Sequence, residues 1–179
     1  MKILEYSRKE LKGIEETTPF RNGKGQIEKG ADHAKKGVDK EKVKIRNQIK
    51  TIAIELGLEP GLALSMAKVE SGYDPKKVSP KGAIGVLQVM PKLAKHDFGI
   101  TREMLFDPQV NIIIGISWMK SLLKRFDQNL DLSLAAYNAG ASRVVKAGYR
   151  VPRIKETQAY VRKVKEHMEN EVSWPVEKI

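Results

Sequence analysis

Beyond the first 41 residues, apolar side chains recur about every three to four positions, which is the spacing of one face of an α-helix. Residues 42–56 carry the first such stripe, and Gly57 is placed to end the helix. The next segment, residues 60–71, is apolar on nearly every side, as is typical of a buried core helix. Gly72 is its natural stop. The pattern therefore predicts two consecutive helices, the second one deeply buried.

The second half of the chain shows the same helical period. Pro108 suits the first turn of a long helix that runs to Phe126. Asp131 is placed to cap the following helix, and Gly140 to end it. Further helical segments are expected at residues 91–99, 142–148 and 156–172, the last being basic and amphipathic. Strand-like alternation is scarce throughout, so the fold class is predicted to be all-α, or nearly so, with short connections.

The two ends of the chain lack this pattern. Residues 1–41 are rich in Lys, Glu and Gly without a sustained apolar period, and we expect a basic N-terminal tail or linker there. The alternative is a basic anchor that holds the protein on an anionic surface. Residues 42–172 are expected to form one folded domain, followed by a short C-terminal tail at 173–179.

Composition narrows the class of protein. A chain of 179 residues suits one domain with one sizeable core. The sequence has no cysteine, and its three histidines lie far apart, so neither a metal nor another cofactor is expected. No apolar run approaches the ~20 residues of a membrane span. The first residues also lack the apolar core of a secretory signal, so we expect another export route, a phage or mobile-element origin, or a removed signal.

The formal net charge of +11 predicts attraction to polyanions, either nucleic acid or the anionic bacterial cell wall. Basic residues are spread along the whole chain, without the interleaved aromatic residues of an RNA- or DNA-reading motif. A nucleic-acid partner is therefore not expected.

Glu70 is the residue that points to chemistry. It lies in the last turn of the predicted core helix, where burial and the negative end of the helix dipole should both raise its pKa. A carboxyl that stays protonated near neutral pH can give a proton to a leaving oxygen, as the acid does in glycosidic bond cleavage. The alternative is an ordinary glutamate that extends to water.

Three later features fit a sugar-binding cleft around this acid. Ser79 and Gln88 lie in a glycine-containing loop, and a Gln amide can bind hydroxyl or acetamido groups. Tyr137 offers an aromatic platform and Asn138 a fixed dipole. Tyr160 could offer its hydroxyl to the buried carboxyl. Each residue also has a structural alternative: a tight loop with a satisfied Gln, core packing for either tyrosine, or a helix cap for the Asn.

Five motifs, VESGYDP, SPKGAIGVLQVMP, DPQVNIIIGISWM, LAAYNAG and ETQAYVRKV, follow one another in this order. Together they closely resemble the soluble lytic transglycosylase catalytic domain. The resemblance covers roughly residues 42–172 and is absent from residues 1–41. It implies a helical, goose-type lysozyme-like domain with a deep groove.

The resemblance also implies roles for single residues. Glu70 matches the family's catalytic acid and base, and Gln88 its substrate-binding glutamine. Tyr137 and Asn138 match the Ala-Tyr-Asn-Ala-Gly motif at the groove. Two further matches are Ser79, a loop serine that lines the groove, and Tyr160, the tyrosine whose hydroxyl approaches the catalytic carboxyl.

Three positions on the loop and the long helix complete this comparison. Asn111 matches an asparagine that we take to be structural. In two places the sequence departs from the family: Leu87 replaces a methionine of the Gly-Leu-Met-Gln motif, and Trp118 stands where a tyrosine is usual. Neither change touches the acid.

The implied activity is non-hydrolytic cleavage of the bond between N-acetylmuramic acid (MurNAc) and N-acetylglucosamine (GlcNAc) in peptidoglycan, giving 1,6-anhydroMurNAc ends. Such a substrate implies the periplasm or cell envelope, or a wall breached by a phage. Two alternatives remain open. If Asp97 or another acid faced Glu70, a hydrolytic muramidase would be plausible. The chain could also be a basic wall-binding module whose site has decayed.

Overall fold

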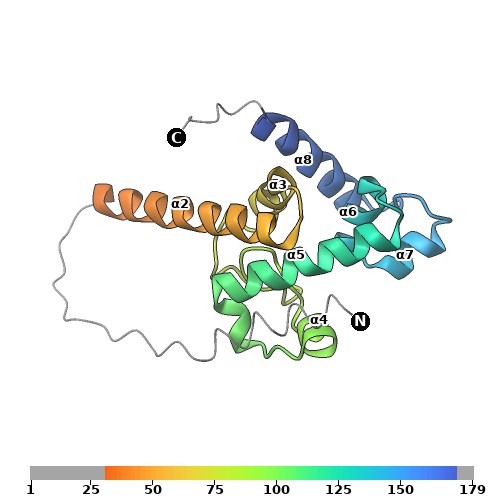
Figure 1. The fold of residues 1–179 in the computed structure, drawn as a ribbon, viewed down its shortest axis with the longest axis horizontal. Coiled ribbons are helices and arrows are strands. Elements are labelled where there is room, and N and C mark those ends of the chain that lie inside the picture. The colour runs from red at the N-terminus through yellow and green to blue at the C-terminus, as the bar shows by residue number, and fades with distance from the viewer. Residues whose placement is uncertain (1–30, 173–179) are drawn as a thin grey trace.

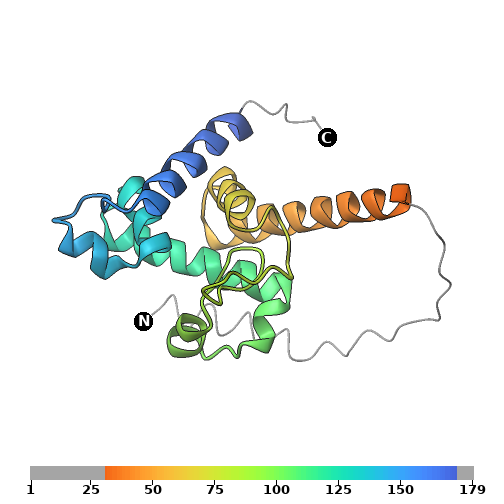
Figure 2. The ribbon, with the colours of Figure 1, turned by 180° about the vertical axis from the view of Figure 1, so that it is seen from behind.

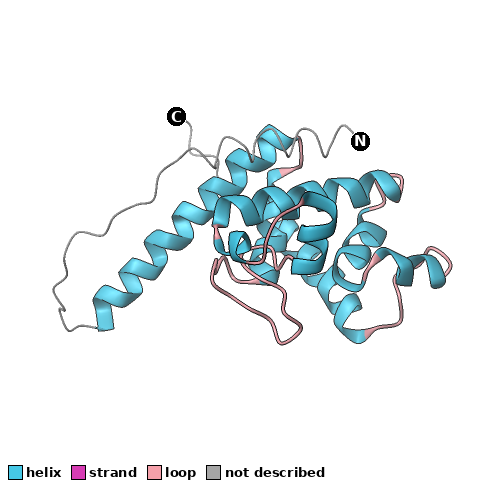
Figure 3. Ribbon diagram, turned by 90° about the horizontal axis from the view of Figure 1, so that it is seen from below, coloured by secondary structure: helices cyan, strands magenta, loops and turns pink. Residues whose placement is uncertain are grey.

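Helices make up nearly all the regular structure of residues 31–172, the part of the chain that the computed structural model describes. No strand is present within this part (Figure 3), although isolated antiparallel bridges join Val78 to Ile84 and Ile84 to Val89 in one long loop. The elements in chain order are α2 (Ala31–Leu56), α3 (Pro60–Glu70), α4 (Pro91–Leu93), the π-helix η1 (Ala94–Phe98), the 3-10 helix η2 (Glu103–Phe106), α5 (Pro108–Arg125), α6 (Leu130–Ala139), α7 (Ala141–Lys146) and α8 (Lys155–Val172). The all-α prediction is confirmed.

The first helix is longer than its apolar stripe. α2 begins at Ala31, so it crosses the boundary predicted at residue 42. Residues 31–41 include two Ala and three Lys, which favour helix without any need for an apolar face. The N-terminal part of α2 accordingly extends away from the other helices (Figures 1 and 2). Of the tail predicted for residues 1–41, residues 1–30 lie outside the described residues, as does the tail predicted for residues 173–179.

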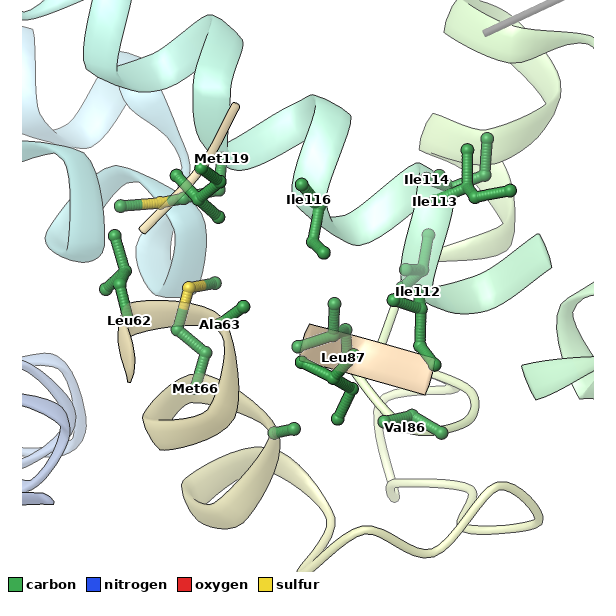
Figure 4. Packing of buried hydrophobic residues seen from close by; sticks show 14 of the residues in the cluster. Leu62, Ala63, Met66, Val86, Leu87, Ile112, Ile113, Ile114, Ile116 and Met119 are labelled. Atoms are coloured by element: carbon green, nitrogen blue, oxygen red, sulfur yellow. The ribbon is translucent and has the colours of Figure 1, made fainter. Parts of the chain in front are cut away.

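The core is built around α3 and α5. α3 packs against α2 and α8, and α5 packs against α2 and α6. Figure 4 shows Leu62 and Met66 of α3 turned toward Met119 of α5, with Leu87 of the following loop near Ile116 of the same helix as Met119. Because all of these residues are buried, the hydrophobic effect fixes both the end of α3 and the loop that follows it.

Side-chain caps set the starts of α5 and α6. The Asp107 carboxylate accepts a hydrogen bond from the Val110 amide at 3.0 Å, as expected for an N-cap. The prediction for α6 was wrong. Asn129 is its cap and accepts from the Leu132 amide at 3.1 Å. Asp131 lies two residues further on, within the first turn, and forms an ion pair with Lys165 of α8 at 2.8 Å.

Candidate active site

Glu70 is the last residue of α3, and the chain fixes this helix end on both sides. On the helix side, the residues from Leu62 to Ala67 are buried in the core. On the loop side, the Ser71 hydroxyl donates to the Val86 carbonyl at 2.8 Å, which ties the helix end to the loop. The backbone then turns at Gly72 with φ +66°. The position of Glu70 is thus set by core packing and one long-range hydrogen bond.

The environment of Glu70 raises its pKa from 4.5 to about 7. Desolvation of the carboxyl is the largest cause. The Tyr160 hydroxyl and the charge of Lys77 act in the opposite direction, while the charge of Glu156 raises the pKa further. The Lys77 ammonium also donates to the backbone carbonyl of Glu70 at 2.7 Å. At neutral pH the side chain therefore populates both its acid and its base form.

Two tyrosines stand next to this carboxyl. The Tyr137 hydroxyl donates to the Leu87 carbonyl at 2.9 Å. The Tyr160 hydroxyl is buried and forms no hydrogen bond of regular geometry with the described residues, yet it lies close enough to lower the pKa of Glu70. Burial and the neighbouring Glu70 charge raise the pKa of both tyrosines well above 10. Both hydroxyls therefore keep their protons, and Tyr160 has its proton available to the carboxyl.

The loop from residue 71 to residue 90 is held from inside by Asn111 of α5. Its side-chain amide donates to the carbonyls of Ile84 and Leu105 at 2.8 and 3.0 Å and accepts from the Leu87 amide at 2.8 Å. The side chain is fully buried, so the expected structural role of Asn111 is confirmed. Gly85 makes this approach possible, since a Cβ there would lie 2.4 Å from Asn111 Nδ2.

Two predicted site residues lie on this loop. Gln88 adopts a left-handed backbone with φ +47°. Its Nε2 donates to the carbonyls of Lys77 and Gly85 at 3.1 and 3.0 Å, while Oε1 makes no hydrogen bond with the described residues. That oxygen is the atom of Gln88 best placed to accept from a ligand. The Ser79 hydroxyl accepts from the Ala83 amide at 3.0 Å, which closes a tight turn.

A groove of about 660 Å³ opens beside this loop. Its wall is formed by α4, η1, Trp118 of α5, the end of α6 and the start of α7. The groove is lined by Lys81, Met90, Lys92, Leu93, His96, Asp97, Trp118, residues 136–140 and Arg143. Gln88 lines a smaller recess that shares Met90, Leu93, Trp118 and Tyr137 with the groove. A separate hollow of about 590 Å³, between α2 and the start of α5, contains none of the predicted site residues.

The structure therefore brings most of the predicted residues together, in two connected groups. Tyr137 and Asn138 line the groove. Glu70 and Tyr160 do not line it, but the Glu70 charge raises the pKa of Tyr137, which does line it. Ser79 is not among the groove residues, and its substrate-binding role stays a prediction.

Sequence reasoning missed several residues that act on the site. Lys77 and Glu156 influence the pKa of Glu70. Lys81 and Glu156 form an ion pair at 2.8 Å that joins the loop to the start of α8. Thr157 donates to Asn138 Oδ1 at 2.8 Å. These partners are far apart in the sequence, so no local spacing signals them. Among the described residues, no group of three or more His, Asp or Glu side chains is arranged to hold a metal ion.

Comparison with known proteins identifies a family for most of the folded part. The family model described as "Transglycosylase SLT domain" matches residues 47–160. The soluble lytic murein transglycosylase of Escherichia coli K12 is 42% identical over 89 residues, covering 46% of this chain and 14% of that protein. Membrane-bound lytic murein transglycosylase C of Actinobacillus pleuropneumoniae is 30% identical over 113 residues, covering 55% of this chain and 31% of that protein. The chain thus spans less than a third of either relative.

Solved structures show the same similarity in three dimensions. The 70 kDa soluble lytic transglycosylase in complex with bulgecin A superposes with a TM-score of 0.64 at 29% identity, covering 72% of this chain and 24% of that one. An inactive Glu→Gln mutant of lytic transglycosylase Slt from Pseudomonas aeruginosa gives a TM-score of 0.62 at 27% identity, covering 73% and 24%. The lysozyme-like helical fold expected from the motifs is confirmed. Within residues 31–172, no helix combines the length and apolar character needed to cross a membrane.

Proposed function

The chain belongs to the transglycosylase SLT domain family, and on that premise we propose that it is a peptidoglycan lytic transglycosylase. It cleaves the β-1,4 bond between MurNAc and GlcNAc without consuming water and leaves 1,6-anhydroMurNAc ends. The observation that carries this proposal is the shielded Glu70 carboxyl, whose pKa of about 7 lets one residue serve as acid and then as base.

The reaction uses Glu70 twice. The protonated carboxyl gives its proton to the glycosidic oxygen, and the bond to the anomeric carbon of MurNAc breaks through an oxocarbenium-like state. The carboxylate then takes the proton of the MurNAc 6-hydroxyl, whose oxygen bonds to the anomeric carbon. The proton gained in the second step replaces the one lost in the first, so the enzyme returns to its starting state. The Tyr160 hydroxyl stabilises the carboxylate between the two steps.

Substrate contacts come from the groove and its recess. Tyr137 and Asn138 face a bound sugar from α6, and Gln88 offers its side-chain oxygen from the recess. Ser79 contributes from the loop. Peptidoglycan as substrate places the activity in the periplasm or cell envelope, or in a wall breached by a phage.

Hydrolysis is the competing reaction on this scaffold. An inverting hydrolase needs a second carboxylate to activate water across ~6.5–9.5 Å. Asp97 does line the groove, but its carboxylate lies 2.5 Å from His96 Nδ1. Glu156 is the carboxylate that acts on the pKa of Glu70, but it is exposed on α8 and paired with Lys81 at 2.8 Å. The site therefore favours the transglycosylase over the hydrolase.

Mass analysis of digested peptidoglycan tests the reaction. We expect anhydro-ended muropeptides from the wild type and at least ~10³-fold less product from Glu70→Gln, since this change removes the acid and base without changing side-chain volume. Glu166→Gln, which neutralises an exposed carboxylate on α8, serves as the matched control and should keep full activity. Reducing ends with water uptake would identify a muramidase instead. A folded wild type that binds the wall and releases nothing would identify a decayed binding module.

A further inference from the structure

The groove beside the candidate active site carries an excess of positive charge. Lys81, Lys92 and Arg143 line it from three different elements, against the single carboxylate of Asp97. Residues 1–41 hold ten basic and eight acidic side chains, a net charge of +2, whereas the whole chain has +11. Most of the basic character therefore belongs to the folded domain and not to the N-terminal segment.

Two of these cations are available to a ligand. Lys81 is paired with Glu156 at 2.8 Å, and Asp97 is paired with His96. Lys92 and Arg143 have no acidic side chain within salt-bridge distance among the described residues. Arg143 donates one guanidinium hydrogen bond to the Ala139 carbonyl at 2.6 Å, which leaves its other donors for a ligand. The groove thus presents two uncompensated cations from two different helices, α4 and α7.

Trp118 adds an aromatic surface next to these cations. It is half-buried on α5 and lines both the groove and the recess that holds Gln88. An indole ring fixed in this way offers a rigid apolar face with a polar N–H at its edge. A sugar ring has a matching apolar face and polar rim. The replacement of a tyrosine by Trp118 enlarges this platform.

We propose that Lys92 and Arg143 are specificity-determining residues, which bind the carboxylate of a muramoyl residue whose sugar ring lies on Trp118. This inference rests on the proposed function and narrows it, because a neutral glycan such as chitin offers no carboxylate. The carboxylate has two sources in peptidoglycan: the lactyl group of a peptide-free MurNAc, or the stem peptide when one is attached. A carboxylate from either source pairs with the same two cations, Lys92 and Arg143.

Binding can be measured without cleavage in a variant that combines Glu70→Gln with Trp174→Phe. Trp118 is then the only tryptophan, so its fluorescence reports on the groove itself. The probes are chitohexaose, a peptide-free MurNAc–GlcNAc hexamer and the same hexamer with stem peptides. At low salt we expect at least one charged glycan to bind about fivefold more tightly than chitohexaose, a preference that salt weakens.

Matched variants locate the charges responsible. Lys92→Gln/Arg143→Gln should abolish the preference for the charged glycan and leave chitohexaose binding unchanged. Lys95→Gln/Lys146→Gln removes the same charge from exposed positions outside the groove and should keep the preference. Trp118→Ala removes the fluorescent reporter, so its binding is measured by calorimetric titration. We expect this variant to bind all three probes about tenfold more weakly, and Trp118→Phe to recover part of that loss.

The outcomes separate the sources and the hypotheses. A preference for the peptide-free hexamer identifies the lactyl carboxylate, and a preference for the peptide-bearing glycan alone identifies the stem peptide. The proposed role of Lys92 and Arg143 would be overturned by equal binding of all probes, by no binding of any probe, or by a preference that survives Lys92→Gln/Arg143→Gln. Absence of anhydro ends in wild-type digests would instead overturn the proposed reaction, whatever the binding result.

A different contact assigns a role to Thr157. This residue of α8 is 1% exposed, and its hydroxyl donates to Asn138 Oδ1 at 2.8 Å. Because Oδ1 is then occupied as an acceptor, the Asn138 amide presents N–H donors to the groove that it lines. We infer that Thr157 is a positioning residue that fixes the orientation of the Asn138 amide toward a sugar oxygen.

Thr157→Val keeps the side-chain volume and removes the hydroxyl. We expect KM for peptidoglycan glycan to rise about fivefold with little change in kcat, and Thr157→Ser to restore it. In an Asn138→Ala background, Thr157→Val should have no further effect on KM, since the residue through which it acts is gone. An equal rise in both backgrounds, or no rise in either, would refute the assignment.

Discussion

Asn111 and Glu70 are polar side chains set against the same loop, one from α5 and one from the end of α3. Asn111 has every side-chain polar atom engaged, with three hydrogen bonds to loop and η2 backbone groups. The Glu70 carboxyl is desolvated and is approached by the Tyr160 hydroxyl, which has no regular hydrogen-bond partner among the described residues. The hydrogen-bonding groups of Asn111 are thus all paired, whereas the Tyr160 hydroxyl beside Glu70 is not.

This difference distinguishes a residue that stabilises the fold from one that can transfer a proton. A buried polar group that is fully paired stabilises the fold, and leaving its partners unpaired is costly. A buried acid with incomplete pairing costs stability and keeps its proton available, which is what proton transfer requires. Substitutions on the two sides of the loop should therefore change stability in opposite directions.

The largest effect on stability is expected at Asn111. Asn111→Ala leaves the Leu87 amide and the carbonyls of Ile84 and Leu105 buried without these partners. We expect the free energy of unfolding to fall by about 4 kcal/mol, measured by urea denaturation. Asn47→Ala, at an exposed position on α2, is the control and should change it by less than about 0.5 kcal/mol. Similar curves for the two variants would contradict the structural role of Asn111.

A substitution at Gly85 tests the contact between Asn111 and the loop from the loop side. Gly85→Ala places a Cβ 2.4 Å from Asn111 Nδ2 and 3.0 Å from the Leu105 carbonyl, at a φ of +79°. Gly82→Ala has the same kind of backbone, with φ +85°, but its Cβ meets nothing within 4 Å. We expect losses of about 3 and about 1 kcal/mol respectively in the same denaturation assay. Equal losses would mean that backbone strain alone, and not contact with Asn111, makes the glycine necessary.

On the other side of the loop, removing the acid should stabilise the protein. The pKa of Glu70 is about 7 in the folded state and near 4.5 in the unfolded chain. The folded protein therefore holds a proton that the unfolded chain releases as pH rises from 4.5 to 7, and stability falls over this range. Glu70→Gln should match the wild type at pH 4 and exceed it by on the order of 2 kcal/mol at pH 8. A wild-type advantage at pH 8 would show that the carboxylate is favourably paired.

The helices on both sides of this comparison could be predicted from the sequence, because burial imposes a local period. The stripe at Ile45 and Ile49, the stop at Gly140 and the first-turn Pro108 all act within one or two turns. The choice of Asn129 over Asp131 as the cap of α6 could not be predicted, because both residues suit a cap and the ion pair of Asp131 with Lys165 depends on how α6 and α8 pack.

The residues of the candidate site could be proposed from the sequence, but the contacts between them could not. Motif order identified Glu70 and its neighbours, whereas the bond from Thr157 to Asn138 joins positions 19 apart and the ion pair of Lys81 with Glu156 joins positions 75 apart. Such contacts depend on how helices dock, which no local pattern encodes. The position of Trp118 in the groove wall likewise follows from the packing of α5 against α2 and α6 and not from its own neighbours in sequence.

The smallest expected effects concern the pH dependence of activity. Tyr160→Phe removes a hydroxyl that lowers the pKa of Glu70, whereas Glu156→Gln removes a charge that raises it. Because cleavage begins with protonated Glu70, activity falls as pH rises through this pKa. The alkaline limb of kcat/KM should therefore move to higher pH in Tyr160→Phe and to lower pH in Glu156→Gln, with Glu166→Gln leaving it in place. Shifts in the same direction in the two variants would mean that they act through the packing of α8 and not through the charge state of Glu70.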